Sequence, residues 1–379
     1  MGFELDEQYK MIGDVATQFA KAEIAPRAKG IDKNAEFPLG IIKKMGGIGL
    51  LGIPVSSEYG GSGAGELGYV VVLEKVSTYC AGTALAIQVT GLAEAPLEIF
   101  GTEEQKRKYL VPLAKGEKLG GLSLTEAHAG SDVLSIRCRA HREGNEYIIN
   151  GTKSWASNLG TEIGIILLYT NFELKGKGMS TIIVENGTPC FRVGKKEHKI
   201  GLRGNHTGDL IFENCRAPVP NLLGPEGEGL KIALRGVTRG RLGIGAIGLG
   251  ISTAALEASK EYAKFRIAFG KPIGSYQAIQ LMIADMATEI EASRLLLYRA
   301  ASMLDRGEKC LREISMAKVF STESALRITD KANEIHGAVG CSEDYPVERY
   351  VRDARALLLL AGANEIQRLR IAAEELKLE

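Results

Sequence analysis

The chain has 379 residues, enough for two or three domains, because single hydrophobic cores rarely grow beyond about 250–300 residues. Its 47 basic and 46 acidic side chains nearly cancel, so no charge excess indicates nucleic acid or an anionic membrane as a partner. The six cysteines form no CxxC pair and show no zinc-like spacing, so we expect no disulfide framework, no metal site and a reducing compartment.

The N-terminal part of the sequence has the period of amphipathic helices. The segment from Met1 to Ala28 alternates apolar and charged residues and lacks the continuous apolar core of a signal peptide. Helical spacing continues to about Glu117, interrupted by Gly/Pro stretches such as GIPVSSEYGGSGAG. We predict a helical first domain over residues 1–120, and no run of residues predicts a transmembrane helix.

The rest of the sequence changes period twice. Between about Leu122 and Leu223 the period shortens to two, as in EYIIN, IGIILLYT and STIIVE, which predicts a middle β-sandwich or barrel over residues 121–226. Beyond Gly227 long helical patterns with many small residues predict a four-helix bundle over residues 227–379. The fold class is therefore α+β and multidomain. Because GxGxxG before a βα unit is absent, a Rossmann site is disfavoured.

Four segments in chain order resemble the signatures of one family. They are LSLTEAHAGSD (122–132), NGTKSWASN (150–158), RIAFGKPIGSYQAIQLMIADMA (266–287) and EDYPVERYVRDAR (343–355). Each is short, but together, on an α, β, α layout, they are specific, and the chain is identified as a member of the acyl-CoA dehydrogenase family. The resemblance covers essentially the whole chain. It implies an FAD-dependent oxidoreductase, typically a homotetramer, with FAD extended between the middle domain and the bundle.

The resemblance implies where the flavin ring would lie. Leu122, Leu124 and Thr125 would line its pyrimidine side, where N–H and hydroxyl donors stabilise charge on the reduced ring. Trp155 would stack on the ring beside Ala156, and Ser157 would keep a hydroxyl near N5 in place of the usual threonine. Without the resemblance, a single tryptophan beside a strand would more often be a core or interface residue.

Two further groups of FAD contacts are implied. The pyrophosphate and adenine end would meet Arg266, Ile267, Ala268, Tyr276 and Gln277, often across a subunit boundary, because a guanidinium suits paired phosphates. The alternative for Arg266 is a solvated side chain at a helix end. The remaining contacts would come from Glu334, Ile335, Gly337, Ala338, Ala363, Asn364 and Glu365.

The segment EIHGAVG departs from the family pattern at two positions. Glu334 stands where relatives have glutamine, and Ala338 stands where they have a second adjacent glycine. A carboxylate near a pyrophosphate is repulsive unless it turns away. His336 lies between them, and we expect it to be structural.

The resemblance implies that the acyl-CoA channel is lined by Ser131, which would also contact FAD, and by Thr238, Arg239 and Gly362, although Thr238 and Arg239 could instead face solvent. The family's usual base is a glutamate, and this sequence has Ala361 at that position in LAGANE. Some relatives carry the base on the helix that here reads VTRGRLGIG, where we expect Thr238, whose hydroxyl is too weak. The catalytic base is therefore unknown, although the backbone N–H of Ala361 could still polarise the thioester carbonyl.

Three accounts of the missing base are open. Another residue could accept a proton from a different carbon, as in 1,4-elimination from a cyclic or conjugated enoyl thioester. The chemistry could need no α-base, as in loss of a sulfinate-like group or in reduction with a solvent proton. The chain could also be a weakened thioester binder. Glu94 and His128 are the unusual titratable groups to inspect, each otherwise a solvated or capping side chain.

We therefore predict an FAD-dependent acyl-CoA dehydrogenase that acts on an atypical acyl-CoA thioester. Hydride would pass to flavin N5, and electrons would pass to an electron-transfer flavoprotein. The alternative is a lyase, desulfinase-like or non-catalytic member on the same scaffold. We expect a homotetramer in a bacterial cytoplasm, with no nucleic-acid or membrane partner.

Overall fold

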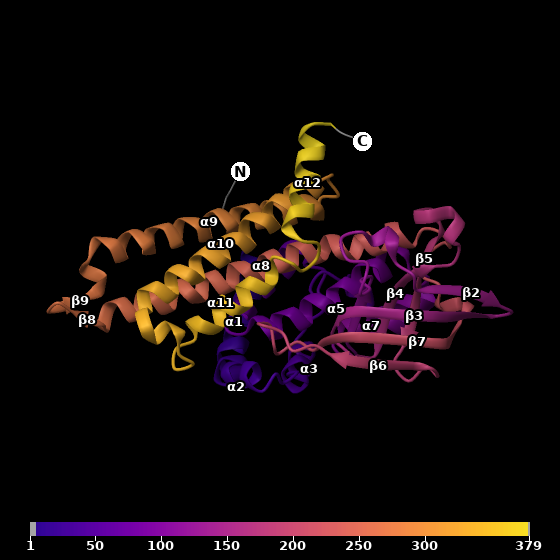
Figure 1. The fold of residues 1–379 in the computed structure, drawn as a ribbon, viewed down its shortest axis with the longest axis horizontal. Helices are drawn as coiled ribbons and strands as arrows, with labels where there is room; N and C mark the ends of the chain where they lie inside the picture. The colour runs from indigo at the N-terminus through magenta and orange to yellow at the C-terminus, as the bar shows by residue number, and fades with distance from the viewer. Residues whose placement is uncertain (1–4, 378–379) are drawn as a thin grey trace.

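The computed structural model describes residues 5–377 and begins with a group of helices (Figure 1). Helices α4 and α5 form the centre of this part, because nearly every side chain of both is buried. Both helices are packed against neighbours on all sides. Their sequences therefore show little separation into an apolar and a polar face. The helices of this part are α1 (Glu7–Phe19), α2 (Ala28–Lys33), α3 (Leu39–Gly47), α4 (Gly65–Ser77), α5 (Ala81–Phe100), α6 (Glu103–Gln105) and α7 (Val111–Ala114).

The middle part is one curled sheet of seven strands in the order β1-β4-β2-β3-β7-β6, with β5 paired to the other side of β4. The β1–β4 pair and the single β2–β4 contact are parallel, and the remaining pairs are antiparallel. The strands are β1 (Gly120–Ser123), β2 (Arg139–Glu143), β3 (Glu146–Ser157), β4 (Ile163–Tyr169), β5 (Met179–Glu185), β6 (Phe191–Lys196) and β7 (Thr207–Pro218).

The last part is a helical bundle around α8, a helix of 37 residues. The bundle confirms the predicted C-terminal helical part, as the curled sheet confirms a middle β part. Its elements are α8 (Gly229–Phe265), β8 (Ile267–Ala268), β9 (Lys271–Pro272), α9 (Gln277–Asp305), α10 (Leu311–His336), α11 (Val347–Leu357) and α12 (Asn364–Glu375). The expected domain limits at residues 120 and 226 stay predictions.

Helix α8 is apolar and long enough, by composition alone, to resemble a membrane span, a feature that the sequence-based prediction of no such helix overlooked. Within this protein 83% of its most apolar window is buried. Glycines allow the close packing: a Cβ on Gly250 would lie 2.4 Å from the Glu74 carbonyl oxygen, and one on Gly236 would lie 2.5 Å from that of Leu92. The core therefore accounts for the apolar character of α8.

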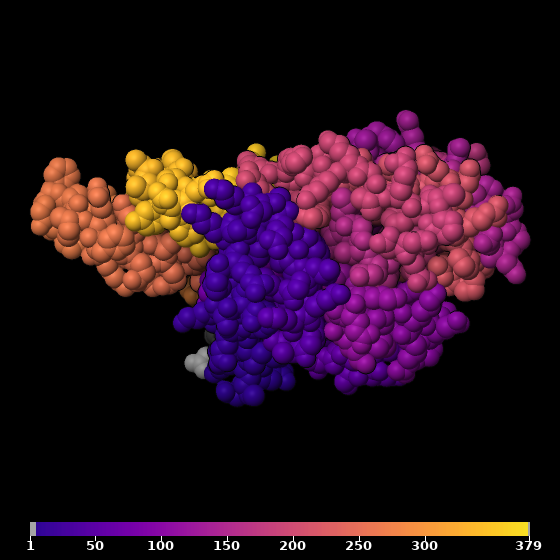
Figure 2. Space-filling model, turned by 90° about the horizontal axis from the view of Figure 1, so that it is seen from below, coloured from indigo at the N-terminus to yellow at the C-terminus, as the bar shows by residue number. Residues whose placement is uncertain are grey.

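The helical first part lies between the bundle and the sheet. In Figure 2 the indigo first part covers the centre of the molecule, with the magenta and pink sheet on one side and the orange and yellow helices on the other. Helices α4 and α5 both pack on α8, so α8 joins the first part to the bundle. The β8–β9 hairpin projects at the far end of the bundle (Figure 1) and carries Phe269, which is 97% exposed.

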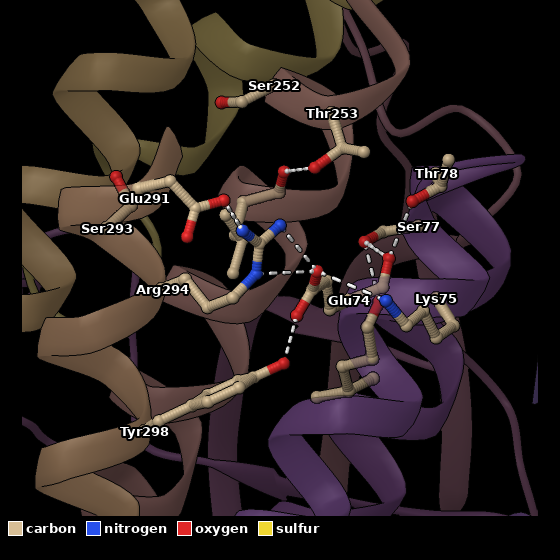
Figure 3. Close-up of polar contacts among 12 residues, drawn as sticks. Glu74, Lys75, Ser77, Thr78, Ser252, Thr253, Glu291, Ser293, Arg294 and Tyr298 are labelled. Atoms are coloured by element: carbon tan, nitrogen blue, oxygen red, sulfur yellow. Dashed lines mark hydrogen bonds and ion pairs between the residues drawn. The ribbon is translucent and has the colours of Figure 1, made fainter. Parts of the chain in front are cut away.

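A buried carboxylate fastens α4 to α9 (Figure 3). Arg294 donates to Glu74 Oε1 from Nε at 3.3 Å and from Nη2 at 3.0 Å, and the Tyr298 hydroxyl donates to Glu74 Oε2 at 2.6 Å. Lys75 lies 3.5 Å from the same carboxylate. The first part and the bundle are therefore held together by a paired charge as well as by apolar contacts.

Candidate active site

Helices α5 and α8 and the loop before α12 meet at Gly240. A Cβ built on Gly240 would lie 3.7 Å from the Cβ of Ala361, 2.5 Å from Leu92 Cδ2 and 3.2 Å from Gln88 Nε2. Gln88 Nε2 donates to the Gly240 carbonyl at 3.3 Å. The residue of α8 that faces Ala361 is therefore a glycine, which has no side chain.

Thr238, where the sequence pattern predicted the second base position, is buried in α8. Its hydroxyl donates to the Leu234 carbonyl at 2.8 Å within α8. Two positions along a helix turn the side chain by about 200°, so Gly240 and Thr238 point to nearly opposite sides. The Cβ position of Gly240 is the one on α8 found against Ala361, and the place expected for Thr238 in the site stays a prediction.

Arg239, expected in the acyl-CoA channel, lies in a buried charge cluster between α4, α5 and α8. Its Nε donates to Glu66 Oε1 at 2.8 Å, and Nη2 lies 3.8 Å from Glu98 Oε2. Burial lowers the pKa of Arg239, but the charges of Glu66 and Glu94 outweigh this effect and raise it overall. Arg239 is only 5% exposed, which removes the solvent-facing alternative.

Glu94 belongs to the same cluster and is 1% exposed, with no hydrogen bond to either carboxylate oxygen within residues 5–377. Burial raises its pKa to about 8, and Arg239 only partly opposes this. Leu92 and Glu94 point to different sides of α5, so the carboxyl faces Arg239 and not Ala361. It can hold or release a proton near neutral pH.

His128 lies on the exposed loop after β1. Its Nε2 is 3.1 Å from the Ser135 carbonyl oxygen and 3.7 Å from Glu126 Oε2. Ser131, expected to contact both FAD and substrate, is exposed on the same loop. Both side chains are accessible to a ligand, but no described contact links either of them to Ala361.

A buried lysine holds the loop that carries Ala361. Lys318 of α10 donates from Nζ to the carbonyls of Leu358 and Gly362, each at 3.1 Å, and to Asn364 Oδ1 at 2.5 Å. All three donors of the ammonium are used. The loop needs this support because Ala361 and Gly362 both have positive φ, 53° and 89°. Burial and the charge of Arg241 lower the pKa of Lys318 to about 7.

Arg241 has no such partners. It is 6% exposed, its Nε is buried without a hydrogen-bond partner, and it forms no ion pair within residues 5–377. Burial, together with the charge of Arg370, lowers its pKa to about 10. Sequence reasoning missed Arg241, Lys318 and Gly240. A charged residue inside an apolar helical stretch was the signal for the first two.

The segments expected to face the flavin ring are adjacent. The Ser154 N–H donates to the Thr125 carbonyl at 2.9 Å, and a Cβ on Gly121 would lie 3.2 Å from the Ser157 carbonyl oxygen. Trp155 is 57% exposed and has a left-handed φ of 58°, so its ring is free to cover a planar ligand. Beside it, Ala156 is buried and the Ser157 hydroxyl lies 3.3 Å from that of Thr207.

A buried ion pair holds the segment after β1 against β3. Lys153 Nζ donates to Glu126 Oε1 at 2.7 Å and to the Leu124 carbonyl at 2.9 Å. Glu126 also accepts from the N–H groups of Arg137 at 2.7 Å and Cys138 at 3.0 Å. The loop that follows β1 is therefore fixed to β3, and Leu122, Leu124 and Thr125 are only half-buried.

The segments expected at the nucleotide end lie far from this surface, at the exposed end of the bundle. Arg266 and Ile267 are exposed, and the Tyr276 hydroxyl donates to the Ala268 carbonyl at 2.9 Å. Gln277 begins α9 and is exposed. We call the surface formed by Leu122, Leu124, Thr125 and residues 155–157 the Trp155 surface. A ligand that contacts both this surface and the exposed end of the bundle would need to be long or to meet a second copy of the chain.

The EIHGAVG segment ends α10. Glu334, Gly337 and Ala338 are exposed and Ile335 is buried, so the Glu334 carboxylate is free to turn away from an anion. Gly337 has a φ of 63° at the helix end. His336 is buried and stacks on Tyr262 with ring centroids 4.4 Å apart, as expected of a structural residue.

Family models match the three parts of the chain in order. They are the acyl-CoA dehydrogenase N-terminal domain over residues 6–117, the middle domain over 121–215 and the C-terminal domain over 227–376. The chain belongs to the acyl-CoA dehydrogenase family. It is thus an enzyme of a family of FAD-binding flavoprotein oxidoreductases, as the four sequence signatures predicted.

Individual relatives span the whole chain. An acyl-CoA dehydrogenase of Bacillus subtilis (strain 168) is 44% identical and covers 97% of both chains. Acryloyl-CoA reductase (NADH) of Anaerotignum propionicum is 42% identical, covering 100% of this chain and 96% of its own length. A solved chain from a study of the electron transferring flavoprotein of Acidaminococcus fermentans has a TM-score of 0.98 at 40% identity, with 100% of both chains covered.

Proposed function

We propose that this member of the family is an FAD-dependent oxidoreductase of an atypical acyl-CoA thioester: cyclic, conjugated or otherwise unlike a simple saturated chain. The observation that carries the proposal is the contact between Gly240 and Ala361, neither of which has a titratable side chain. Removal of an acidic α-proton needs a positioned base. A substrate that gives up its proton elsewhere, or that is reduced with a proton from solvent, avoids that need.

The residues of the Trp155 surface fit a flavin. Trp155 is exposed, and Leu122, Leu124 and the hydroxyl-bearing Thr125 are half-buried beside it. Bound there, FAD would supply hydride transfer to or from the acyl group. Leu122, Leu124, Thr125, Ala156 and Ser157 would bind the ring, and the arginine, tyrosine and glutamine of 266–277 would bind the nucleotide end, contributed by a second copy in a homotetramer.

The loop of Ala361 would hold the thioester. Lys318 fixes this loop through two of its carbonyls, so the backbone N–H of Ala361 stays available to polarise the thioester carbonyl. Ala363, Asn364 and Glu365 follow directly and would contact FAD. Ser131 and Gly362 are exposed and would line the channel, whereas Thr238 and Arg239 are buried and would act on it only indirectly.

The proton acceptor would be a water molecule that Glu94 serves, because the Glu94 carboxyl itself faces Arg239 and not Ala361. Glu94 is favoured over His128 because its carboxyl has no other partner and its pKa of about 8 suits proton transfer at neutral pH. His128 already bonds to the Ser135 carbonyl. Electrons would be exchanged with an electron-transfer flavoprotein, in a bacterial cytoplasm.

The test is anaerobic mixing of the purified flavoprotein with two thioesters, followed by flavin absorbance. Butyryl-CoA represents simple saturated chains, and cyclohex-1-ene-1-carboxyl-CoA represents cyclic enoyl chains. Bleaching by the cyclic thioester at a rate at least tenfold above that with butyryl-CoA supports the proposal. Equal or faster bleaching by butyryl-CoA contradicts the atypical substrate. Bleaching by neither, with reduced flavin also failing to reduce cyclohex-1-ene-1-carboxyl-CoA, contradicts an oxidoreductase.

A further inference from the structure

A charged cavity lies where the three parts of the chain meet. It has a volume of about 120 Å³ and is lined by α2 of the first part, by the loop between β6 and β7 and by the start of α11. Its wall contains both cationic and acidic side chains. None of the residues in the wall belongs to the Trp155 surface or to the loop of Ala361.

Three acids of the wall are already paired. Arg352 of α11 donates from Nη2 to Asp32 Oδ2 at 2.6 Å and from Nε to Glu348 Oε2 at 2.8 Å. Lys33 Nζ donates to Glu343 Oε2 at 3.0 Å. These carboxylates are therefore neutralised by Arg352 and Lys33, and not by the other cations that line the cavity.

Three cations of the wall are left without an acid. Arg349 is 9% exposed, and its guanidinium carbon lies 5.4 Å from the ring centroid of the neighbouring Tyr350. Arg203 is half-buried and donates from Nε to the Lys199 carbonyl at 3.2 Å. Neither these two arginines nor Lys29 forms an ion pair within residues 5–377. A buried cation of this kind is costly unless a negative charge accompanies it.

Two other acids near these cations do not supply that charge. Asp344 lines the cavity, but it is exposed and its carboxylate is solvated. Asp353, one turn beyond Arg349 on α11, is buried, and its Oδ1 accepts from the Leu202 N–H at 2.6 Å. It forms no ion pair with Arg349, and burial raises its pKa to about 6. The cavity therefore favours a ligand that carries negative charge.

We propose that this cavity binds a phosphate-type oxyanion between Arg349 and Arg203. Arginine suits this role because its planar fork binds an oxyanion through two N–H groups. Arg349 also lies in the first turn of α11, where the free N–H groups of a helix attract an anion. Because the two arginines come from the bundle and from the sheet, a bound oxyanion would fasten these parts to each other. Inorganic phosphate and the phosphate group of a nucleotide share this chemistry.

The experiment measures binding of inorganic phosphate to the flavin-loaded protein by calorimetry at constant ionic strength, with chloride as the balancing anion. We expect one site per chain, and we expect Arg349→Met and Arg203→Met each to weaken binding at least tenfold. Arg355→Met is the matched control, because Arg355 is exposed on α11 and lies outside the cavity wall. It should bind phosphate as the native protein does. No binding by the native protein, or undiminished binding by Arg203→Met, overturns the inference.

Two further measurements complete the test. Competition by ADP separates the sources: displacement of phosphate by ADP indicates a nucleotide phosphate, and no displacement indicates the free ion, and both support the oxyanion site. Phosphate should raise the melting temperature of the native protein and of Arg355→Met more than that of Arg203→Met, which also decides the case if Arg349→Met does not fold. Loss of bound FAD from Arg203→Met would mean that this arginine holds the cofactor, and it overturns the inference. Because no acyl-CoA is used, the outcome is independent of the proposed substrate.

Discussion

Gly240 and Ala361 face each other across the junction of α8 and the loop before α12, where a Cβ on Gly240 would lie 3.7 Å from that of Ala361. Each is a position from which a longer side chain would reach the same space. Replacing Ala361 by glutamate would put a carboxylate there.

We expect Ala361→Glu to raise α,β-dehydrogenation of butyryl-CoA by at least tenfold, because a positioned base contributes about 10²–10⁴ in rate. Anaerobic flavin bleaching measures the gain. Ala361→Gln has the same shape without a base and should show none. If Ala361→Glu and Ala361→Gln show the same rate of flavin bleaching with every acyl-CoA tested, the reacting carbon of the substrate does not lie at this junction.

Glu94 should make stability depend on pH. Its pKa is about 8 in the folded protein and near 4.5 when unfolded, so between these values the folded state binds the extra proton. The stabilisation is complete below about pH 4.5 and is lost as pH rises through about 8, with a slope of about 1.4 kcal/mol per pH unit between them.

Glu94→Gln should therefore flatten the decline in unfolding free energy between pH 5 and 8, and it should be the more stable protein at pH 8. Urea denaturation at a series of pH values measures the difference. The exposed Glu104→Gln is the matched control and should leave the slope unchanged. An unchanged slope in Glu94→Gln would mean that Glu94 is ionised in the folded state.

Periodicity predicted the three-part fold, because long amphipathic helices and alternating strands record burial directly in the sequence. The site was predictable only as segments. The spacing on α8 did not single out Gly240 as a residue packed near Ala361, because a glycine leaves no side-chain pattern and a shift of two residues turns a helix by about 200°. The stripe Gly236, Gly240 and Gly243, each with a Cβ position that α5 side chains or backbone occupy, marks the face of α8 that packs on α5.

The partners of buried charges could not be predicted at all. Arg239 and Arg241 look alike in VTRGRLGIG, yet one meets a glutamate 173 positions away and the other meets none within the described residues. Lys318 finds two of its acceptors 40 and 44 positions on, and both are backbone carbonyls that any residue supplies. Such pairings depend on tertiary packing and leave no local pattern.

Lys318→Met should destabilise the loop of Ala361, because it leaves two buried carbonyls and the Asn364 side chain without their donor. We expect a loss of about 2–4 kcal/mol of unfolding free energy. Amide hydrogen exchange should increase over residues 358–364 more than elsewhere. Lys331→Met, on the same helix but paired with Asp285 near the surface, should change stability by less than about 1 kcal/mol.

The pKa of Lys318 adds a pH dependence of opposite sign to that of Glu94. It is about 7 in the folded protein and near 10.5 when unfolded, so between these pH values the folded state binds fewer protons than the unfolded state. The contribution is present above about pH 10.5 and is lost as pH falls through about 7. The stability gap between native protein and Lys318→Met should therefore widen from pH 7 to pH 10. A gap that is constant with pH would show that the lysine titrates normally.

The Glu74 cluster in Figure 3 allows a last prediction about how the first part is attached to the bundle. Glu74 is almost fully buried, and Arg294 is its principal cation, at 3.0 Å. Arg294→Met would strand that carboxylate and should cost about 3–5 kcal/mol. Arg294 also pairs with Glu291, which is exposed, so Glu291→Gln is the matched control and should cost at most about 0.5 kcal/mol. In the double variant Glu74→Gln, Arg294→Met most of the loss should be recovered, because no buried charge remains. If the double variant is as unstable as the sum of the single ones, the two charges do not act on each other.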